Sequence, residues 1–408
     1  MKKVWDKWTR IALVKRILVG LILGAVLGIA VPQATGIAIL GDVFVSALKA
    51  IAPLLVFFLV ISSLCNAGKS HGGVIKTVII LYMFSTVLAA VIAVFASMAF
   101  PVKMTLANAA TDTSAPQGIV EVLNNLLLNV VANPVSSLVN ANYVGILMWA
   151  VLLGLAFRAA DKMTKKVLAD VADGISMVVT WIINLAPFGI FGLVFNTVST
   201  NGLDIFTTYG KLLLLLVGCM LFIYFVTNPL LVYWCIRQNP YPLIFQCLKR
   251  SALTAFFTRS SAANIPVNMK VCEEMGLDRD TYSVTIPLGA TINMDGAAIT
   301  ITVMTMATAF TLGIHVDIPT AIILSFLAAL SACGASGVAG GSLLLIPMAC
   351  SLFGISDDIS MQVVAVGFII GVVQDSVETA LNSSSDLLLS ASAEFRQWRL
   401  EGKEIKFK

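Results

Sequence analysis

Hydrophobic residues in this 408-residue chain form long runs that recur along its whole length. A run of about 20 apolar residues is long enough to cross the hydrocarbon core of a bilayer as a helix. The pattern predicts eight membrane-spanning helices, at residues 12–31, 40–65, 74–101, 140–159, 171–199, 210–236, 281–313 and 361–392. Several exceed about 20 residues, so we expect them to tilt, kink or extend beyond the hydrocarbon.

Two further apolar stretches, 243–271 and 318–352, have centres that a lipid-facing helix does not tolerate. The first contains TRSSAANIP (258–266) and the second contains CGASGVAGG (333–341). Irregular backbone at membrane depth is stable only when it is buried in protein or lines an aqueous cavity. Each stretch is therefore predicted to be a re-entrant helical hairpin. The alternative, two ordinary helices with a glycine packing seam, fits poorly with Arg259 and its serine neighbours.

Each predicted hairpin is followed by a spanning helix with polar residues at its centre. Hairpin plus helix occurs twice, entering once from each side, and this pattern is typical of inverted-repeat transporters with a binding site between the repeats. The predicted fold class is an all-α polytopic membrane protein with eight transmembrane helices and two oppositely oriented re-entrant helical hairpins.

Composition and charge agree with this prediction. Of all residues, 58% are hydrophobic and 12% are charged, whereas soluble domains carry roughly 25% charged residues. The net charge of +4 is small, so we expect no nucleic-acid partner. Lys and Arg gather before the first helix, near 69–76, 158–166 and 237–250, and after 395. By the positive-inside rule, both termini are expected in the cytoplasm, for a multi-pass protein of the bacterial inner (plasma) membrane.

The seventh predicted span contains LGATINMDGAAITI (288–301), with Asn293 and Asp295 mid-membrane beside Gly296. A carboxylate at that depth is unfavourable unless it faces a partner or an ion. Unwinding next to the glycine would free backbone carbonyls, which with the Asn and Asp oxygens form the oxygen cage that hard cations require. A purely structural ion pair between Asp295 and Arg259 is the alternative. The seven cysteines show no CxxC pair, and His71 and His315 lie in polar or segment-end positions, so no metal site is expected from those residues.

Polar residues of the last predicted span fall on one helical face. Asp375, Glu378, Thr379, Asn382 and Asp386 have offsets of 0, 3, 4, 7 and 11, which form one continuous stripe at helical periodicity. Such an acidic stripe suits an amine-bearing substrate and a cation. In the third span, a smaller set of Tyr82, Ser85 and Thr86 shares a face. By itself that set is more typical of hydrogen bonds within or between helices.

Four motifs together resemble the glutamate and neutral amino acid transporter family, the dicarboxylate/amino acid:cation symporters. They are TRSSAANIPV, LGATINMDGAA, GASGVAGG and QDSVETALNSSSD, and the similarity extends over essentially the whole chain. Within the family, the chain is most similar to the bacterial serine/threonine–sodium symporters. The resemblance implies sodium-coupled alternating access and a homotrimer in the lipid bilayer. It implies a scaffold and oligomerisation half at 1–242, a transport core at 243–392 and a cytoplasmic tail at 393–408.

The resemblance also implies roles for matching residues. Asp375 would hold the substrate amino group near Arg259, while Asn382, Ser261 and the amide of Val338 would bind the substrate carboxylate. Three sodium sites are implied. Their residues are Gly289, Asn293, Asn382 and Asp386 in one, Tyr82, Ser85, Thr86, Asn293 and Asp295 in a deeper one, and Thr291 with carbonyls near Ala332, Cys333 and Ala335 in the third.

Two departures from the family pattern bear on the substrate. Acidic amino acid transporters have an arginine at the position of Glu378 and a threonine at that of Ala297. Glu378 would repel a side-chain carboxylate and can accept a hydrogen bond from a hydroxyl, which favours serine or threonine. Ser342 is a second candidate hydroxyl partner, and Thr379 completes the expected substrate set.

Three other functions were weighed. A proton-coupled neutral amino acid carrier would use Glu378 as its proton site. A dicarboxylate symporter of the same fold would need a cationic residue facing the substrate side chain. An intramembrane serine hydrolase would lack a membrane-centred base for Ser260 or Ser261, so the protein is not expected to be an enzyme.

Overall fold

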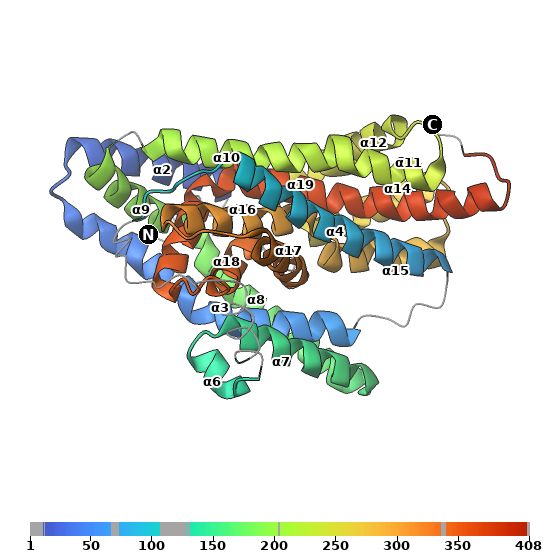
Figure 1. The fold of residues 1–408 in the computed structure, drawn as a ribbon, viewed down its shortest axis with the longest axis horizontal. Coiled ribbons are helices and arrows are strands. Elements are labelled where there is room, and N and C mark those ends of the chain that lie inside the picture. Colours follow the sequence, from blue (N-terminus) through green and yellow to red (C-terminus); the bar gives the residue numbers. More distant parts are fainter. Residues whose placement is uncertain are drawn as a thin grey trace.

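The computed structural model describes residues 11, 13–66, 73–106, 128, 131–202, 205–335 and 340–405. Within this part of the chain every regular element is a helix (Figure 1). The main helices are α2 (Leu13–Ala30), α3 (Ile39–Asn66), α4 (Gly73–Ala99), α6 (Pro134–Val139), α7 (Tyr143–Ala156), α8 (Lys162–Asn184), α9 (Ala186–Asn201), α10 (Ile205–Phe222), α11 (Asn228–Ile236), α12 (Tyr241–Cys247), α13 (Leu253–Thr258), α14 (Ser261–Glu274), α15 (Arg279–Ile292), α16 (Asp295–Thr311), α17 (Ile318–Ala332), α18 (Ile346–Ser351) and α19 (Asp357–Leu400).

Several helices have the length and composition to cross a membrane. Among the described residues there are six such stretches, at Thr35–Ser62, Gly73–Ala99, Lys162–Asn184, Phe206–Ile236, Arg279–Thr311 and Asp357–Leu400. Shorter apolar helices include Gly145–Ala159 and Ala186–Thr200. The predicted all-helical class is confirmed, and these helices are those of a multi-pass membrane protein.

Three of the predicted spans differ from the observed helices in where a helix breaks or ends. The predicted span 171–199 is two helices, α8 and α9, which are separated at Leu185, because Pro187 has no N–H to continue the helical ladder. The predicted span 281–313 is broken between α15 and α16, at Asn293 and Met294. Helix α19 continues to Leu400, past the expected end at residue 392.

Aspartates begin two helices that follow loops. The side chain of Asp161 accepts a hydrogen bond from the Thr164 amide at 2.7 Å, and that of Asp317 accepts one from the Thr320 amide at 2.8 Å. The hydrogen bonds from Thr164 and Thr320 hold the pKa of both carboxyls below the usual range. Both aspartates therefore act as charged N-caps of α8 and α17.

Glycines bring α2 and α9 into close contact. A Cβ on Gly20 would lie 2.2 Å from the Pro187 carbonyl oxygen, one on Gly24 would lie 2.6 Å from that of Phe191, and one on Gly28 would lie 3.0 Å from that of Phe195. This four-residue repeat is the small-residue seam that lets membrane helices approach backbone to backbone. It belongs to α2 and α9, whereas the sequence suggested a glycine seam only as the alternative to the two re-entrant hairpins.

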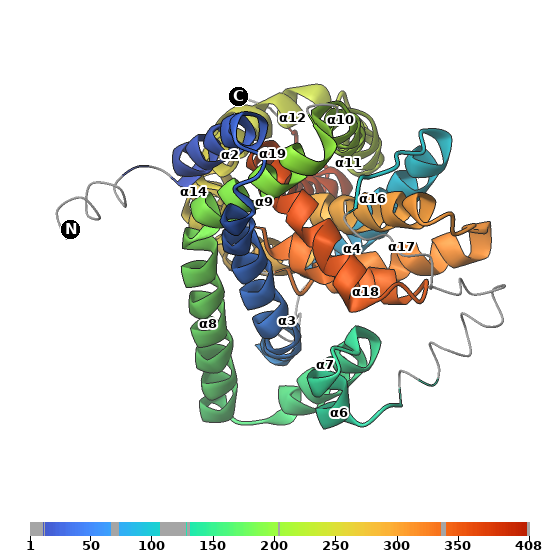
Figure 2. The ribbon, with the colours of Figure 1, turned by 90° about the vertical axis from the view of Figure 1, so that its left-hand side faces the viewer.

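The helices form two groups by their packing. Helices α2, α3, α7, α8 and α9 pack on one another, while α4, α10 and α11 pack on the elements from α13 to α19. Figure 2 shows α3, α6, α7 and α8 on one side of α4, α16, α17 and α18. The groups meet where α19 contacts α3 and α9.

Both interrupted stretches are pairs of helices joined by a break. In the first, α12, a π-helical turn (Leu248–Ala252) and α13 lead to a tip at Arg259 and Ser260, from which α14 packs back against α13. In the second, α17 is followed by a turn, a 3-10 helix η5 (Gly341–Leu345) and α18, which contact α17. Residues 336–339 of the second stretch lie outside the described residues, and the re-entrant path predicted for both stretches stays a prediction.

Candidate functional site

The acidic stripe predicted on the last span is buried in the protein. Asp375, Glu378, Thr379, Asn382 and Asp386 all lie on α19, and each is at most 7% exposed. Helix α19 contacts α13, α14, α15, α16 and α18, so other elements surround it. The stripe therefore faces protein, as its periodicity indicated.

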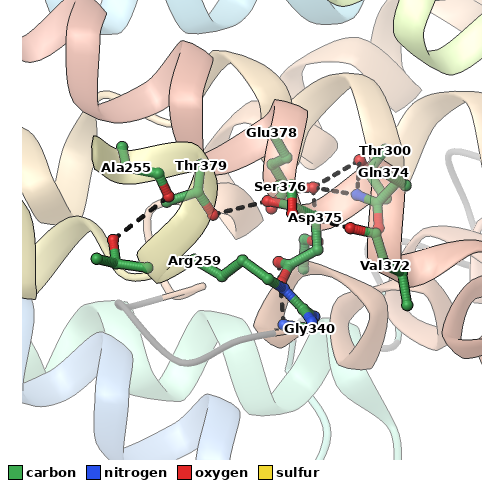
Figure 3. Close-up of polar contacts among 12 residues, drawn as sticks. Ala255, Arg259, Thr300, Gly340, Val372, Gln374, Asp375, Ser376, Glu378 and Thr379 are labelled. Carbon is green, nitrogen blue, oxygen red and sulfur yellow. Dashed lines mark hydrogen bonds and ion pairs between the residues drawn. The ribbon is translucent and has the colours of Figure 1, made fainter. Parts of the chain in front are cut away.

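Asp375 is held by groups from both interrupted stretches (Figure 3). One carboxylate oxygen, Oδ2, accepts a hydrogen bond from Nε of Arg259 at 2.6 Å, and Oδ1 accepts one from the Gly340 amide at 3.1 Å. Arg259 ends α13 in the left-handed conformation, with φ of 51°. The expected proximity of Arg259 and Asp375 is present, and Gly340 is a partner that the sequence did not reveal.

Glu378 lies one helical turn further along α19 and receives only neutral donors. Its Oε2 atom accepts hydrogen bonds from Thr300 at 2.6 Å, Ser342 at 2.9 Å and Gln374 at 2.5 Å. In the described part of the chain, its other oxygen accepts no hydrogen bond, and no Lys or Arg pairs with it. The three hydrogen bonds fix the position of this carboxyl group.

The break between α15 and α16 faces the same helix. Asn293 donates from Nδ2 to Ser385 at 2.8 Å and to Oδ1 of Asp386 at 2.9 Å. Its own Oδ1 is buried and has no partner in the described part of the chain. The amide of Gly296 donates to Oδ1 of Asn382 at 2.7 Å. A Cβ on Gly289 would lie 2.8 Å from Asp386 Oδ1. Gly289, Asn293, Asn382 and Asp386 are thus brought together as expected.

The weak cluster on the third span reaches the break from the other side. Ser85 donates to Oδ2 of Asp295 at 2.7 Å, and Thr86 donates to Oδ1 at 3.2 Å. Tyr82 instead donates to the backbone carbonyl of Asp386 at 2.8 Å. Asp295 has no link to Arg259, whose partner is Asp375, so the alternative of a structural Asp295–Arg259 pair is wrong.

These contacts define a buried site of hard oxygen atoms. Asp295 and Asp386 are at most 1% exposed, and within the described chain neither forms an ion pair with Lys or Arg. Buried carboxylates without a cation are unfavourable unless something neutralises them. Among the described residues, no three His, Cys, Asp or Glu side chains cluster as a metal site. Carboxylate, amide, hydroxyl and carbonyl oxygens suit a hard cation.

Three expected site residues are less closely connected. Ser261 is buried at the first turn of α14, beside Ser260, whose hydroxyl caps that helix. Thr291 donates to the Leu288 carbonyl of its own helix, while Cys333 Sγ lies 3.7 Å from the Ile292 carbonyl and brings the second stretch close. Val338 lies outside the described residues.

Sequence reasoning missed two residues that hold Glu378. Gln374 precedes it by four positions, so helical spacing alone places the two on one face. Thr300 is within the quoted 288–301 motif, but nothing in a single sequence indicates that α16 turns this hydroxyl towards α19. Gln374 donates to Thr300 at 2.7 Å, which links the three side chains.

Apolar helices packed around buried carboxylates, with two broken helix pairs meeting at Asp375, are typical of a membrane transporter. The chain belongs to the sodium:dicarboxylate symporter family, whose pattern it matches over residues 13–394. The family resemblance seen in the sequence is therefore confirmed. Members of this family are transporters, and the expectation that the protein is not an enzyme agrees with that.

Similar proteins from two bacteria cover nearly the whole chain. One is the serine/threonine transporter SstT of Bifidobacterium adolescentis, with 57% identity over 406 residues, 99% of this chain and 94% of the relative. The serine/threonine transporter SstT of Streptococcus thermophilus is 55% identical over 400 residues, 98% of this chain and 100% of the relative. The same protein from a second strain of that species has the same identity and coverage.

Proposed function

We propose that the protein is a sodium-coupled symporter that carries serine and threonine into the cell. The observation that carries this proposal is the environment of Glu378. Three donors hold Oε2 and leave Oε1 without a partner in the described chain. A negative, unpaired oxygen in a buried site accepts a hydrogen bond from a substrate hydroxyl and repels a substrate carboxylate. The relatives that share more than half of the sequence are serine/threonine transporters by name.

The rest of the substrate has partners nearby. The ammonium group would take the place of Arg259 Nε or the Gly340 amide at Asp375. The Oδ1 atom of Asn382 accepts from the Gly296 amide, and within the described residues the one partner of its Nδ2 atom is the Met294 sulfur at 3.5 Å. Because a thioether is a weak acceptor, Nδ2 is available to the substrate carboxylate. The amides at the start of α14, around Ser261, are a second donor set for that carboxylate.

Sodium would bind at the two oxygen clusters around the break. One is formed by Gly289, Asn293, Asn382 and Asp386, and the other by Ser85, Thr86 and Asp295, with Thr291 near a third site. Asn293 is two positions before Asp295, and its Nδ2 atom donates to Asp386. Its Oδ1 atom has no partner among the described residues and supports a cation there. Because sodium and substrate both order the break and α19, each would raise the affinity of the other by the same factor.

Two candidate functions remain weaker. A proton-coupled carrier would need Glu378 to take and release a proton in each cycle, and three donors already hold its Oε2 atom. A dicarboxylate symporter, which the family name includes, needs a cation at the substrate side chain. Arg259, at the tip of the first interrupted stretch, is already paired with Asp375.

For the architecture, we propose eight membrane crossings, two re-entrant hairpins of opposite orientation, a homotrimer and cytoplasmic termini. The packing supports a transport unit larger than residues 243–392. Helices α4, α10 and α11 pack on α16 and α19, and α4 supplies Ser85 and Thr86. They would move with the core against a scaffold of α2, α3, α7, α8 and α9.

The variant Asp375→Asn tests the assignment of the substrate amino group. It keeps an oxygen for Arg259 and removes the charge that an ammonium group requires, so we expect serine uptake to fall at least about 100-fold. Ser376→Ala is the matched control, because that hydroxyl donates to Val372 of its own helix. Near-normal uptake by a folded Asp375→Asn protein would exclude Asp375 as the ammonium partner.

A further inference from the structure

Asn228 is a fully buried amide beside the deep oxygen cluster, and no role described above uses it. It begins α11, directly after a π-helical turn at Ile223–Thr227, and is 0% exposed. Its Nδ2 atom is buried and has no hydrogen-bond partner among the described residues. Its Oδ1 atom lies 3.4 Å from the hydroxyl oxygen of Ser85. A buried amide with so few partners is unfavourable, so packing alone does not explain an asparagine at this position.

The hydroxyl of Ser85 has two candidate acceptors and one hydrogen. Asp295 Oδ2 is at 2.7 Å and Asn228 Oδ1 is at 3.4 Å, so the hydrogen is on the side of Asp295 in this structure. Thr86 differs, because it donates to Asp295 Oδ1 and accepts from the Met294 amide at 3.2 Å. Ser85 is therefore the member of the cluster whose hydroxyl can rotate and donate its hydrogen bond to a second acceptor.

The helix that carries Asn228 is distorted and held in place at this point. Pro229 follows Asn228 and has no N–H to donate to the carbonyl of Phe225, four residues before the proline. The hydroxyl of Tyr241 donates to that carbonyl instead, at 3.3 Å. A π-helical turn adds a residue to the helix and changes the direction of the side chains that follow, and such turns are frequent at functional sites. Here the turn ends at the residue before Asn228.

We propose that Asn228 is a positioning residue of the deep sodium site. When the Ser85 oxygen coordinates sodium, Asn228 Oδ1 accepts the hydrogen bond from the Ser85 hydroxyl. A cation at Asp295 repels a hydroxyl hydrogen that points towards it. Turning that hydrogen to Asn228 Oδ1 frees both Ser85 Oγ and Asp295 Oδ2 for the ion. Without the Asn228 acceptor, the Ser85 hydroxyl would have no hydrogen-bond partner once sodium is bound, and sodium would bind more weakly.

This inference rests on the proposed sodium site at Ser85, Thr86 and Asp295, and goes beyond it by naming a residue outside the ligand set. It predicts which of two Asn228 variants binds sodium more tightly, and a residue that only fills space would give the opposite order. Asn228→Leu has a similar volume and no acceptor, whereas Asn228→Asp keeps an acceptor oxygen and adds a buried charge. For a residue that only fills space, Leu is tolerated and Asp is disruptive. For a hydrogen acceptor, Asp retains sodium binding and Leu loses it.

The experiment is a sodium titration of the purified full-length protein without serine, with thermal stability as the readout and choline as the replacement cation. We expect Asn228→Leu to raise the sodium concentration for half-maximal stabilisation about tenfold, the equivalent of about 1.4 kcal/mol. Asn228→Asp should remain within about threefold of the wild type. In sodium-driven uptake, Asn228→Leu should show the same shift in sodium dependence, with an unchanged maximal rate at saturating sodium.

Ser85→Ala separates the inference from the function on which it rests. If Ser85→Ala leaves sodium affinity unchanged, the proposed deep site itself is wrong. If Ser85→Ala weakens sodium binding and Asn228→Leu does not, the role of Asn228 is wrong. The double variant should be no weaker than Ser85→Ala alone, because Asn228 acts only through that hydroxyl. Should Asn228→Leu fail to fold, Asn228→Ala carries the same expectation and the same contradicting result.

Discussion

Asp375 and Glu378 are neighbouring carboxylates on α19 with different partners. Asp375 is paired with a guanidinium and a backbone amide, whereas Glu378 has only Thr300, Ser342 and Gln374. A Cβ on Gly296 would lie 2.9 Å from Cα of Glu378, so α16 and α19 touch at this point. Three hydrogen bonds and the contact with α16 therefore fix Glu378 in position.

Glu378→Gln should relax discrimination against acidic amino acids. The amide oxygen can still accept from the three donors, while the charge that repels a substrate carboxylate is removed. We expect aspartate to compete with serine at least about tenfold better than in the wild type. Competition measured in serine uptake gives the ratio, and Asp280→Asn, which removes a charge from an exposed position, is the control. Equal exclusion of aspartate by both variants would mean that Glu378 does not face the side chain.

How far single residues could be placed from the sequence depended on helical phase. The α19 stripe and the Arg259–Asp375 proximity were predicted, since one follows regular spacing and the other follows the family motifs. Ser342 was expected to face the substrate hydroxyl, and in the structure it donates to Glu378. Asn228 could not be found, because the π-helical turn before it shifts the phase that regular spacing assumes.

At the scale of elements, the end of α17 and the start of η5 come into close backbone contact at Gly341. A Cβ on Gly341 would lie 2.5 Å from the carbonyl oxygen of Ala335, which is a backbone atom and cannot move aside freely. Nearby, Gly340 has φ of 73° and donates to Asp375. The two sides of this break therefore approach each other next to the substrate site.

Gly341→Ala should impair transport more than folding. The added methyl group would push the Ala335 backbone away and disturb the closed turn, so we expect serine uptake to fall about tenfold or more. Gly371→Ala on α19 is a matched control, because a Cβ there has no atom within 4 Å. Uptake and monodispersity of the purified variants provide the measurement. Equal activity of the two variants would show that the close approach at Gly341 is unimportant.

Element boundaries show what hydrophobic runs can and cannot predict. The run at 40–65 is α3 within one residue at each end, and the helix continues through Pro53. The run at 171–199 hides the end of α8 at Asn184, since Ala186 and Pro187 are compatible with an apolar pattern. The unwound residues Asn293 and Met294 were anticipated, because a glycine and a buried carboxylate stand beside them.

At the scale of the whole molecule, few polar contacts join the two groups of helices. Lys49 of α3 reaches the start of α19, 2.7 Å from Asp358 Oδ1 and 3.1 Å from Asp357 Oδ2. Phe44 and Phe368 meet edge to face with ring centroids 5.2 Å apart. The division of the chain by sequence order assigned α4, α10 and α11 to the scaffold, and their packing on α16 and α19 supports placing them in the core.

Charge reversal at Lys49 tests whether these two groups move relative to each other. Lys49→Glu places three acidic groups together and disfavours the arrangement in this structure. Exposed ion pairs contribute about 0–1 kcal/mol, so we expect a change of up to about fivefold in the maximal uptake rate, with unchanged substrate selectivity. The double variant Lys49→Glu/Asp358→Lys should recover most of the change. If reversal alters neither rate nor sodium dependence, this contact does not bias transport.

The most direct test of the central claim is uptake of labelled L-serine by the purified protein in proteoliposomes. With inward sodium, we expect concentrative uptake that excess threonine abolishes and succinate leaves unchanged. With sodium replaced by choline, we expect no accumulation, even when an inward proton gradient is imposed. Proton-driven serine accumulation without sodium, or competition by succinate, would contradict sodium-coupled transport of serine and threonine.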